Sequence, residues 1–161
     1  MSKVTVTTTV NASNHVRNNY QYDDIFLNFP NQQKTFTFVN GTASERTIVA
    51  GTLVGITTAD QTIAQPLASD AVDGSQTPYG FVLYDIVIPA GAAEEVDALV
   101  GFGDDQSSIF ADQITLEKVG DTLDTVITDL GISIRNAVMA YCKVQIEESA
   151  QNISDSKDAD V

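Results

Sequence analysis

The sequence predicts a mainly β protein, a small β-sandwich with one short α-helix near the C-terminal third and an extended N-terminal arm. Two observations predict this class. Apolar and polar residues alternate over several short runs, which is the period of a strand with one buried face. Turn signals such as Asn40-Gly41 and Asp73-Gly74 separate these runs. A chain of 161 residues is long enough for one domain with a buried core and extensions at both ends.

Residues 1–33 are predicted to form the extended arm. Valine and threonine alternate in its first ten residues with a period of two, which favours a strand. Apolar residues are then few until Ile25, so this stretch cannot build a core of its own. We expect the arm to order on a partner or to add a strand to a sheet, although an ordinary edge strand fits equally well. The candidate binding residues are Lys3, Val4, Thr5, Val6, Thr7, Thr8, Thr9 and Val10.

Residues 34–146 are predicted to form the β-rich domain. Phe36 and Phe38 share one face of its first strand, and Asn40-Gly41 follows as a hairpin turn. The run 79–88 is apolar on both faces, so we expect one long strand at the centre of the domain. Further strands are expected at residues 45–49, 51–58, 63–67, 94–102 and 138–146.

One segment of the chain has a helical pattern. Asp121 is a suitable N-cap and Gly131 a suitable C-cap. The apolar residues between them recur at the spacing of one helix face: Leu123, Val126, Ile127 and Leu130. After the last strand the chain is acidic and poor in apolar residues, so residues 147–161 are predicted to be a disordered tail.

Charge is divided unevenly along the chain, whose formal net charge is −14. Residues 1–46 carry four bases and three acids, whereas residues 47–161 carry four bases and nineteen acids. Such a body repels nucleic acid and anionic membranes, and no apolar run is long enough to cross a bilayer. The N-terminus lacks the apolar block of a signal peptide, so we expect synthesis in a host cytoplasm without nucleic acid or membrane as partner. Two accounts of the uneven charge fit equally well: the near-neutral N-terminal part touches a partner while the acidic body faces solvent, or the acidic surface serves solubility alone.

Residues that could carry catalysis are few. His15 is the one histidine and lies in the predicted arm, so a Ser-His-Asp or Cys-His site lacks a plausible base. Cys142 is the one cysteine and is expected on the inward face of a strand, where a thiol is inert. One cysteine and one histidine also exclude an ordinary zinc site. We therefore expect no enzyme activity and no cofactor.

Acidic loops are the remaining candidates for a metal. Asp70 and Asp73 lie beside the turn residue Gly74, and Asp104-Asp105 forms a second pair. Neither group has the alternating oxygen ligands and distal glutamate of a calcium-binding EF-hand loop. We therefore interpret these carboxylates as solvated loop residues and expect no metal.

Several short motifs occur in one order between Ile48 and Ile134. They are Ala50-Gly-Thr-Leu-Val-Gly55, Ala68-Ser-Asp-Ala-Val-Asp-Gly-Ser-Gln76, Tyr79-Gly-Phe-Val-Leu-Tyr-Asp85, Glu95-Val-Asp-Ala-Leu-Val-Gly101 and Asp129-Leu-Gly-Ile132. By this pattern the region resembles the tailed-phage head decoration proteins, the lambda D-like capsid cement family. The chain departs from that family in its longer arm, in an additional strand at Lys34–Val39 and in its acidic tail.

The resemblance implies a β-tulip-like domain and a non-enzymatic structural role. The protein would form an oligomer, with a trimer favoured, on the outer capsid surface of a virion, where it would bind the major capsid protein and stabilise the expanded shell. Residues Ser2 to about Val10 would order against the shell and extend a sheet. The alternatives are another virion surface protein, such as a head-fibre base or a minor capsid component, and a small β-fold module that binds a ligand or carbohydrate.

Overall fold

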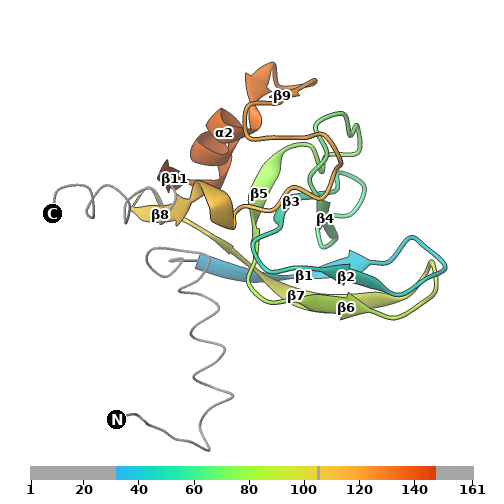
Figure 1. Cartoon of the computed structure of the whole chain (residues 1–161). Coiled ribbons are helices and arrows are strands. Elements are labelled where there is room, and N and C mark those ends of the chain that lie inside the picture. Colours follow the sequence, from blue (N-terminus) through green and yellow to red (C-terminus); the bar gives the residue numbers. More distant parts are fainter. Residues whose placement is uncertain (1–31, 105, 148–161) are drawn as a thin grey trace, which may run out of the picture.

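The computed structural model describes residues 32–104 and 106–147 and is mainly β (Figure 1). This confirms the predicted class, including one short α-helix near the C-terminal third. The strands are β1 (Gln32–Val39), β2 (Arg46–Ile48), β3 (Leu53–Ile56), β4 (Ala64–Pro66), β5 (Pro78–Val82), β6 (Ile86–Ile88), β7 (Glu95–Phe102), β8 (Ser107–Phe110), β9 (Val126–Ile127), β10 (Ile132–Ser133) and β11 (Val144–Glu147). The helical elements are the 3-10 turn η1 (Ala111–Gln113), α2 (Ile134–Ala137) and the π-helical turn η2 (Val138–Cys142).

An antiparallel five-stranded sheet in the order β1-β7-β5-β3-β4 divides the apolar interior in two. Side chains alternate between the two faces along β3 and β5. Leu53 and Phe81 therefore lie on one side of the sheet, and Val54 and Val82 lie on the other. The first side, which we call the helix-side core, is closed by residues of α2, η2 and β11. The second side, the hairpin-side core, is closed by the paired strands β2 and β6.

The segment predicted as one central strand is two strands in the structure. β5 lies at the centre of the five-stranded sheet, as expected, but the chain leaves that sheet after Leu83 and resumes as β6, which pairs with β2. At the break, Oδ1 of Asp85 accepts a hydrogen bond from the main-chain N–H of Ala50 at 2.8 Å. This bond joins residues 35 positions apart, so a local pattern could not show it.

The Asn40-Gly41 turn reverses the chain but does not form a two-stranded hairpin. The strand before the turn, β1, pairs with β7, and the strand after it, β2, pairs with β6 (Figure 1). The turn instead packs on the loop between β6 and β7, where the N–H of Asn40 donates to the carbonyl of Glu94 at 2.9 Å. Two ribbons, β1–β7 and β2–β6, are therefore linked at one end by two loops that contact each other.

The helix predicted between Asp121 and Gly131 is wrong. That segment consists of turns and the short strand β9, and both carboxylate oxygens of Asp121 accept bonds from Ser69 instead of capping a helix. The helix begins later, at Ile134, where Oγ of Ser133 accepts from the N–H of Asn136 at 3.3 Å.

Helical turns also occupy the start of the strand predicted at residues 138–146. η2 is followed by Lys143, which has a left-handed φ of 59°, and only β11 remains extended. β11 pairs in parallel with β8, a strand that the sequence did not predict. Glu147, which was assigned to the tail, is the last residue of β11, and the rest of that predicted tail lies outside the described residues. Among the described helices, none has the length and apolar character needed to cross a membrane.

Candidate functional site

The predicted binding residues Lys3 to Val10 lie outside the described residues. The other candidates from the sequence, the acidic loops and Cys142, lie within the described residues except for Asp105.

The acidic loop at Asp73-Gly74 is held by its own side chains. Oδ1 of Asp73 accepts from the N–H of Ser75 at 3.0 Å and from its hydroxyl at 2.6 Å, and these bonds lower the pKa of Asp73. Gln76 accepts from the N–H of Gly74 and donates to the carboxylate of Asp129 at 2.8 Å. These hydrogen bonds fix the conformation of the loop that precedes β5, and Asp73 is an exposed loop residue, as predicted.

The second acid of this region, Asp70, forms an ion pair with Lys118 at 2.9 Å. The hydrogen bond to that ammonium lowers the pKa of Asp70 and raises the pKa of Lys118. Lys118 also donates to the hydroxyl of Ser69. Across residues 32–104 and 106–147, no group of three histidine, cysteine, aspartate or glutamate side chains is arranged to hold a metal ion.

Cys142 is buried in the helix-side core, and burial raises the pKa of its thiol. Because the thiolate is the reactive form, we expect a thiol reagent such as DTNB to label the native protein at least about 100-fold more slowly than the urea-unfolded protein at pH 8. The double variant Cys142→Ala/Tyr141→Cys is the matched control, since the Tyr141 side chain is 49% exposed. Native wild-type labelling as fast as that of the control would contradict the burial of Cys142.

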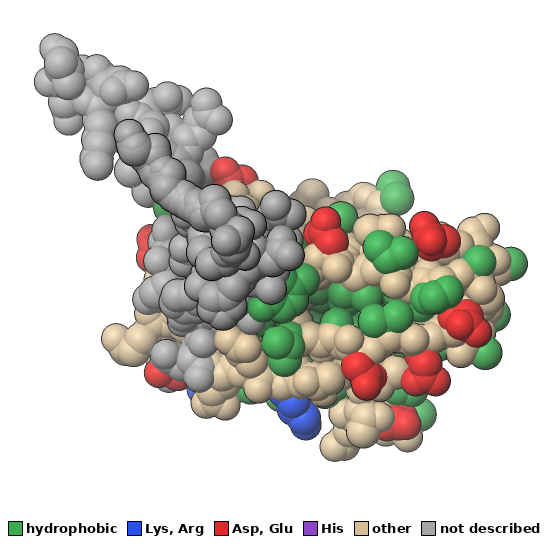
Figure 2. All heavy atoms as spheres, turned by 90° about the horizontal axis from the view of Figure 1, so that it is seen from below, with side chains coloured by type: hydrophobic (Ala, Val, Ile, Leu, Met, Phe, Trp, Pro, Cys, Tyr) green, Lys and Arg blue, Asp and Glu red, His purple; other side chains and the backbone are tan. Residues whose placement is uncertain are grey.

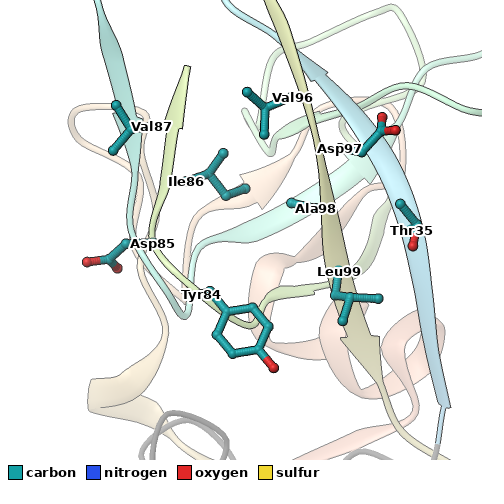
Figure 3. Close-up of a pocket in the computed structure, with 9 residues that line it drawn as sticks. All are labelled: Thr35, Tyr84, Asp85, Ile86, Val87, Val96, Asp97, Ala98 and Leu99. Carbon is teal, nitrogen blue, oxygen red and sulfur yellow. The ribbon is translucent and has the colours of Figure 1, made fainter. Parts of the chain in front are cut away.

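An apolar groove lies open between β6 and β7 (Figure 3). Its volume is about 350 Å³. Figure 3 shows Ile86 of β6 pointing across the opening towards Val96 and Ala98 of β7. The groove thus reaches the hairpin-side core, because the two strands belong to different ribbons and do not pair with each other. The lining residues are Thr35, Tyr84, Asp85, Ile86, Val87, Val96, Asp97, Ala98 and Leu99.

The edge of β7 that borders this groove presents main-chain groups. In an antiparallel pair, residues alternate between those that bond to the partner strand and those that turn both groups away. The bonds from Asn40 N–H to Glu94 O and from Leu83 N–H to Leu99 O fix that alternation. Glu95 and Asp97 therefore turn their N–H and C=O groups away from β1 and towards the groove, where they have no main-chain partner in the described part of the chain.

Acidic side chains surround the groove. Figure 2 shows apolar atoms in the hollow with separate carboxylates along its margin. Asp97 accepts a hydrogen bond from the hydroxyl of Thr37 at 2.7 Å and remains exposed. The exposed acids of β7, of the loop before it and of the β5–β6 break are Asp85, Glu94, Glu95 and Asp97. The groove is therefore an apolar slot with a negative rim and an open strand edge.

A second hollow, of about 320 Å³, lies between Tyr79 and Tyr141. The ring of Tyr79 packs edge-on against Phe36 and Phe102, with ring centroids 5.1 and 5.0 Å away. Burial raises the pKa of the Tyr79 hydroxyl. If the protein were a carbohydrate-binding module, we would expect a sugar to bind in this hollow against the aromatic ring of Tyr79.

Sequence reasoning missed the groove between β6 and β7. It arises from the break at Leu83–Asp85 and from the choice of different partners by β6 and β7. The available signal was Asp85, a charged residue within an otherwise apolar run. Comparison with family models, with curated proteins and with solved structures found no match to this chain.

Proposed function

We propose that the protein is a non-enzymatic virion structural protein that binds the outer surface of a tailed-phage capsid and stabilises the expanded shell as an oligomer. The observation that carries this proposal is the pattern resemblance of residues Ile48–Ile134, which extend from the end of β2 to the start of α2. The motifs behind that resemblance form the centre of the β body: β3, the Asp73 loop, β5 and β7.

The structure supports the proposal by giving these motifs packing roles. Gly80 lies in β5 beside its paired neighbour β7, and a Cβ atom there would lie 2.6 Å from the carbonyl oxygen of Gly101. The acids of the loops take part in bonds that hold the body together, such as Asp121 to Ser69 and Asp129 to Gln76. A closely packed β body of this kind suits a protein that acts by presenting a binding surface and not by catalysing a reaction.

Capsid attachment would depend on many weak contacts made at once. An oligomer that bridges neighbouring capsomers binds with an avidity well above that of one contact, because each further contact is intramolecular. The arm would contribute main-chain hydrogen bonds by adding a strand to the major capsid protein, and the acidic body would keep decorated particles soluble.

Removing residues 1–20 is expected to leave a folded oligomer that no longer binds expanded capsids of the parent virus. Co-sedimentation with purified particles measures binding, while circular dichroism and gel filtration show whether the truncated protein is folded and oligomeric. A double variant of the arm, Thr5→Ser/Thr7→Ser, is the matched control and should still bind. Normal decoration by the truncated protein would contradict the role of the arm.

The alternatives are separated by different measurements. A head-fibre base or minor capsid component would be present in far fewer copies per particle than a cement protein. A carbohydrate-binding module would show specific binding of a sugar at the hollow between Tyr79 and Tyr141, with no dependence on capsids.

A further inference from the structure

The groove between β6 and β7 offers two kinds of contact to an extended segment. Ile86 and Ala98 provide an apolar floor, and Glu95 and Asp97 provide main-chain donors and acceptors along one edge. Open strand edges of this kind are places where a further strand adds. We propose that the chain's own segment Lys3–Val10 lies along this groove as a short strand paired with β7.

The side-chain pattern of the segment fits such a groove. In an extended chain, side chains two residues apart point to the same side. Val4 and Val6 therefore face one way, while Thr5 and Thr7 face the other. The valines enter the slot above Ile86 and Ala98, and the threonines face solvent.

Charge also favours this segment. Residues 1–22 contain no acid and include Lys3 and Arg17, so they complement the acidic rim of the groove. The other apolar stretch of the N-terminal region, residues 25–29, directly follows Asp23 and Asp24, which that rim would repel.

The connection to β1 allows the segment to reach its own body. The 21 residues between Val10 and Gln32 can span up to roughly 70 Å when extended, far more than the groove requires. A tether of this length gives an effective concentration on the order of 1 mM, so the chain's own arm has an advantage over a second copy in dilute solution. The inference concerns the protein free of any capsid and does not depend on the capsid proposal. On an expanded shell the segment would leave the groove to add its strand to the major capsid protein.

The test is amide hydrogen exchange in the full-length protein, followed by NMR. The amides of Glu95 and Asp97 are expected to exchange at least about tenfold more slowly than exposed amides. In the double variant Val4→Asp/Val6→Asp this protection should be lost. The matched variant Thr5→Asp/Thr7→Asp adds the same charge on the opposite side and should retain most of the protection. The amide of Val96, which faces β1, should be unchanged throughout and reports that the body is folded.

Three results would overturn the proposal. The first is rapid exchange of Glu95 and Asp97 in the wild-type protein. The second is protection that survives Val4→Asp/Val6→Asp but is lost in Ile25→Asp/Leu27→Asp, which would assign the groove to residues 25–29. The third is protection that rises when protein concentration is raised from about 50 to about 500 µM, which would assign it to the arm of a second copy. Loss of capsid binding without any change in exchange would affect the proposed function alone.

Discussion

Replacing Gly55 with alanine is expected to lower the free energy of unfolding by at least about 4 kcal/mol, enough to leave much of the protein unfolded. Gly55 lies in β3, at the point where its pairing with β5 shifts register. A Cβ atom there would lie 2.6 Å from the carbonyl oxygen of Thr77 and would also clash with the carbonyl oxygen of Ser75. Both obstacles are main chain, so no flexible side chain can move aside, and the strand itself would have to shift.

Urea denaturation followed by circular dichroism measures this loss. Gly131→Ala is the matched control, because its φ is 67° but no atom lies within 4 Å of the added Cβ. That control should cost only about 1–2 kcal/mol, the strain of a left-handed alanine. If the two variants were destabilised equally, the close packing of the Asp73 loop on β3 would be wrong.

Alternation of side chains made much of the β body predictable. β1 and β7 appear within two residues of their expected bounds, because each strand has one buried face and this sets a clear period of two. Phe36 and Phe38 are buried together on the same face, as the pattern indicated. Paired strands with one solvated face are the elements that a local pattern describes best.

The segment from Asp121 to Gly131 shows where periodicity misleads. Its apolar spacing fits a helix, but side chains and turns satisfy its main chain instead: Oγ1 of Thr125 accepts from the N–H of Thr122 at 2.9 Å. Gly131 does adopt a positive φ of 67°, but it ends a turn and not a helix. The sequence could not show the bonds from Ser69 to Asp121, because they join residues 52 positions apart.

The groove between β6 and β7 could not be predicted from the sequence for the same reason, because it depends on pairing between residues far apart in the chain. Asp85 interrupts the apolar run, but one charged residue does not show that the first half of the run joins a five-stranded sheet while its second half pairs with β2. Only the three-dimensional pairing shows that the β7 edge at Glu95 and Asp97 faces an apolar opening.

Replacing Asn40 with alanine is expected to lower the free energy of unfolding by about 2–4 kcal/mol. The side chain is 1% exposed, and its amide holds the two loops that join the β1–β7 and β2–β6 ribbons. Nδ2 donates to the carbonyl oxygens of Ser44 at 2.7 Å and Pro89 at 2.6 Å, while Oδ1 accepts from the N–H and the hydroxyl of Thr42. Alanine fills less space and leaves those carbonyl groups without their donor.

The variant Asn40→Asp gives a sharper test, because aspartate has the shape of asparagine but carries an oxygen in place of the Nδ2 donor. At pH 7 its second carboxylate oxygen would face the carbonyl oxygens of Ser44 and Pro89, so the charged form is penalised and its folded pKa rises above the unfolded value. The stability deficit of Asn40→Asp relative to wild type should then shrink as pH falls from the raised folded pKa towards about 4. Asn136→Asp, with the same charge change on an exposed residue, should show a far smaller pH dependence. A deficit in Asn40→Asp that stays constant between pH 7 and pH 4 would mean that the amide does not donate to both loops, and the link between the two ribbons would have to be sought elsewhere.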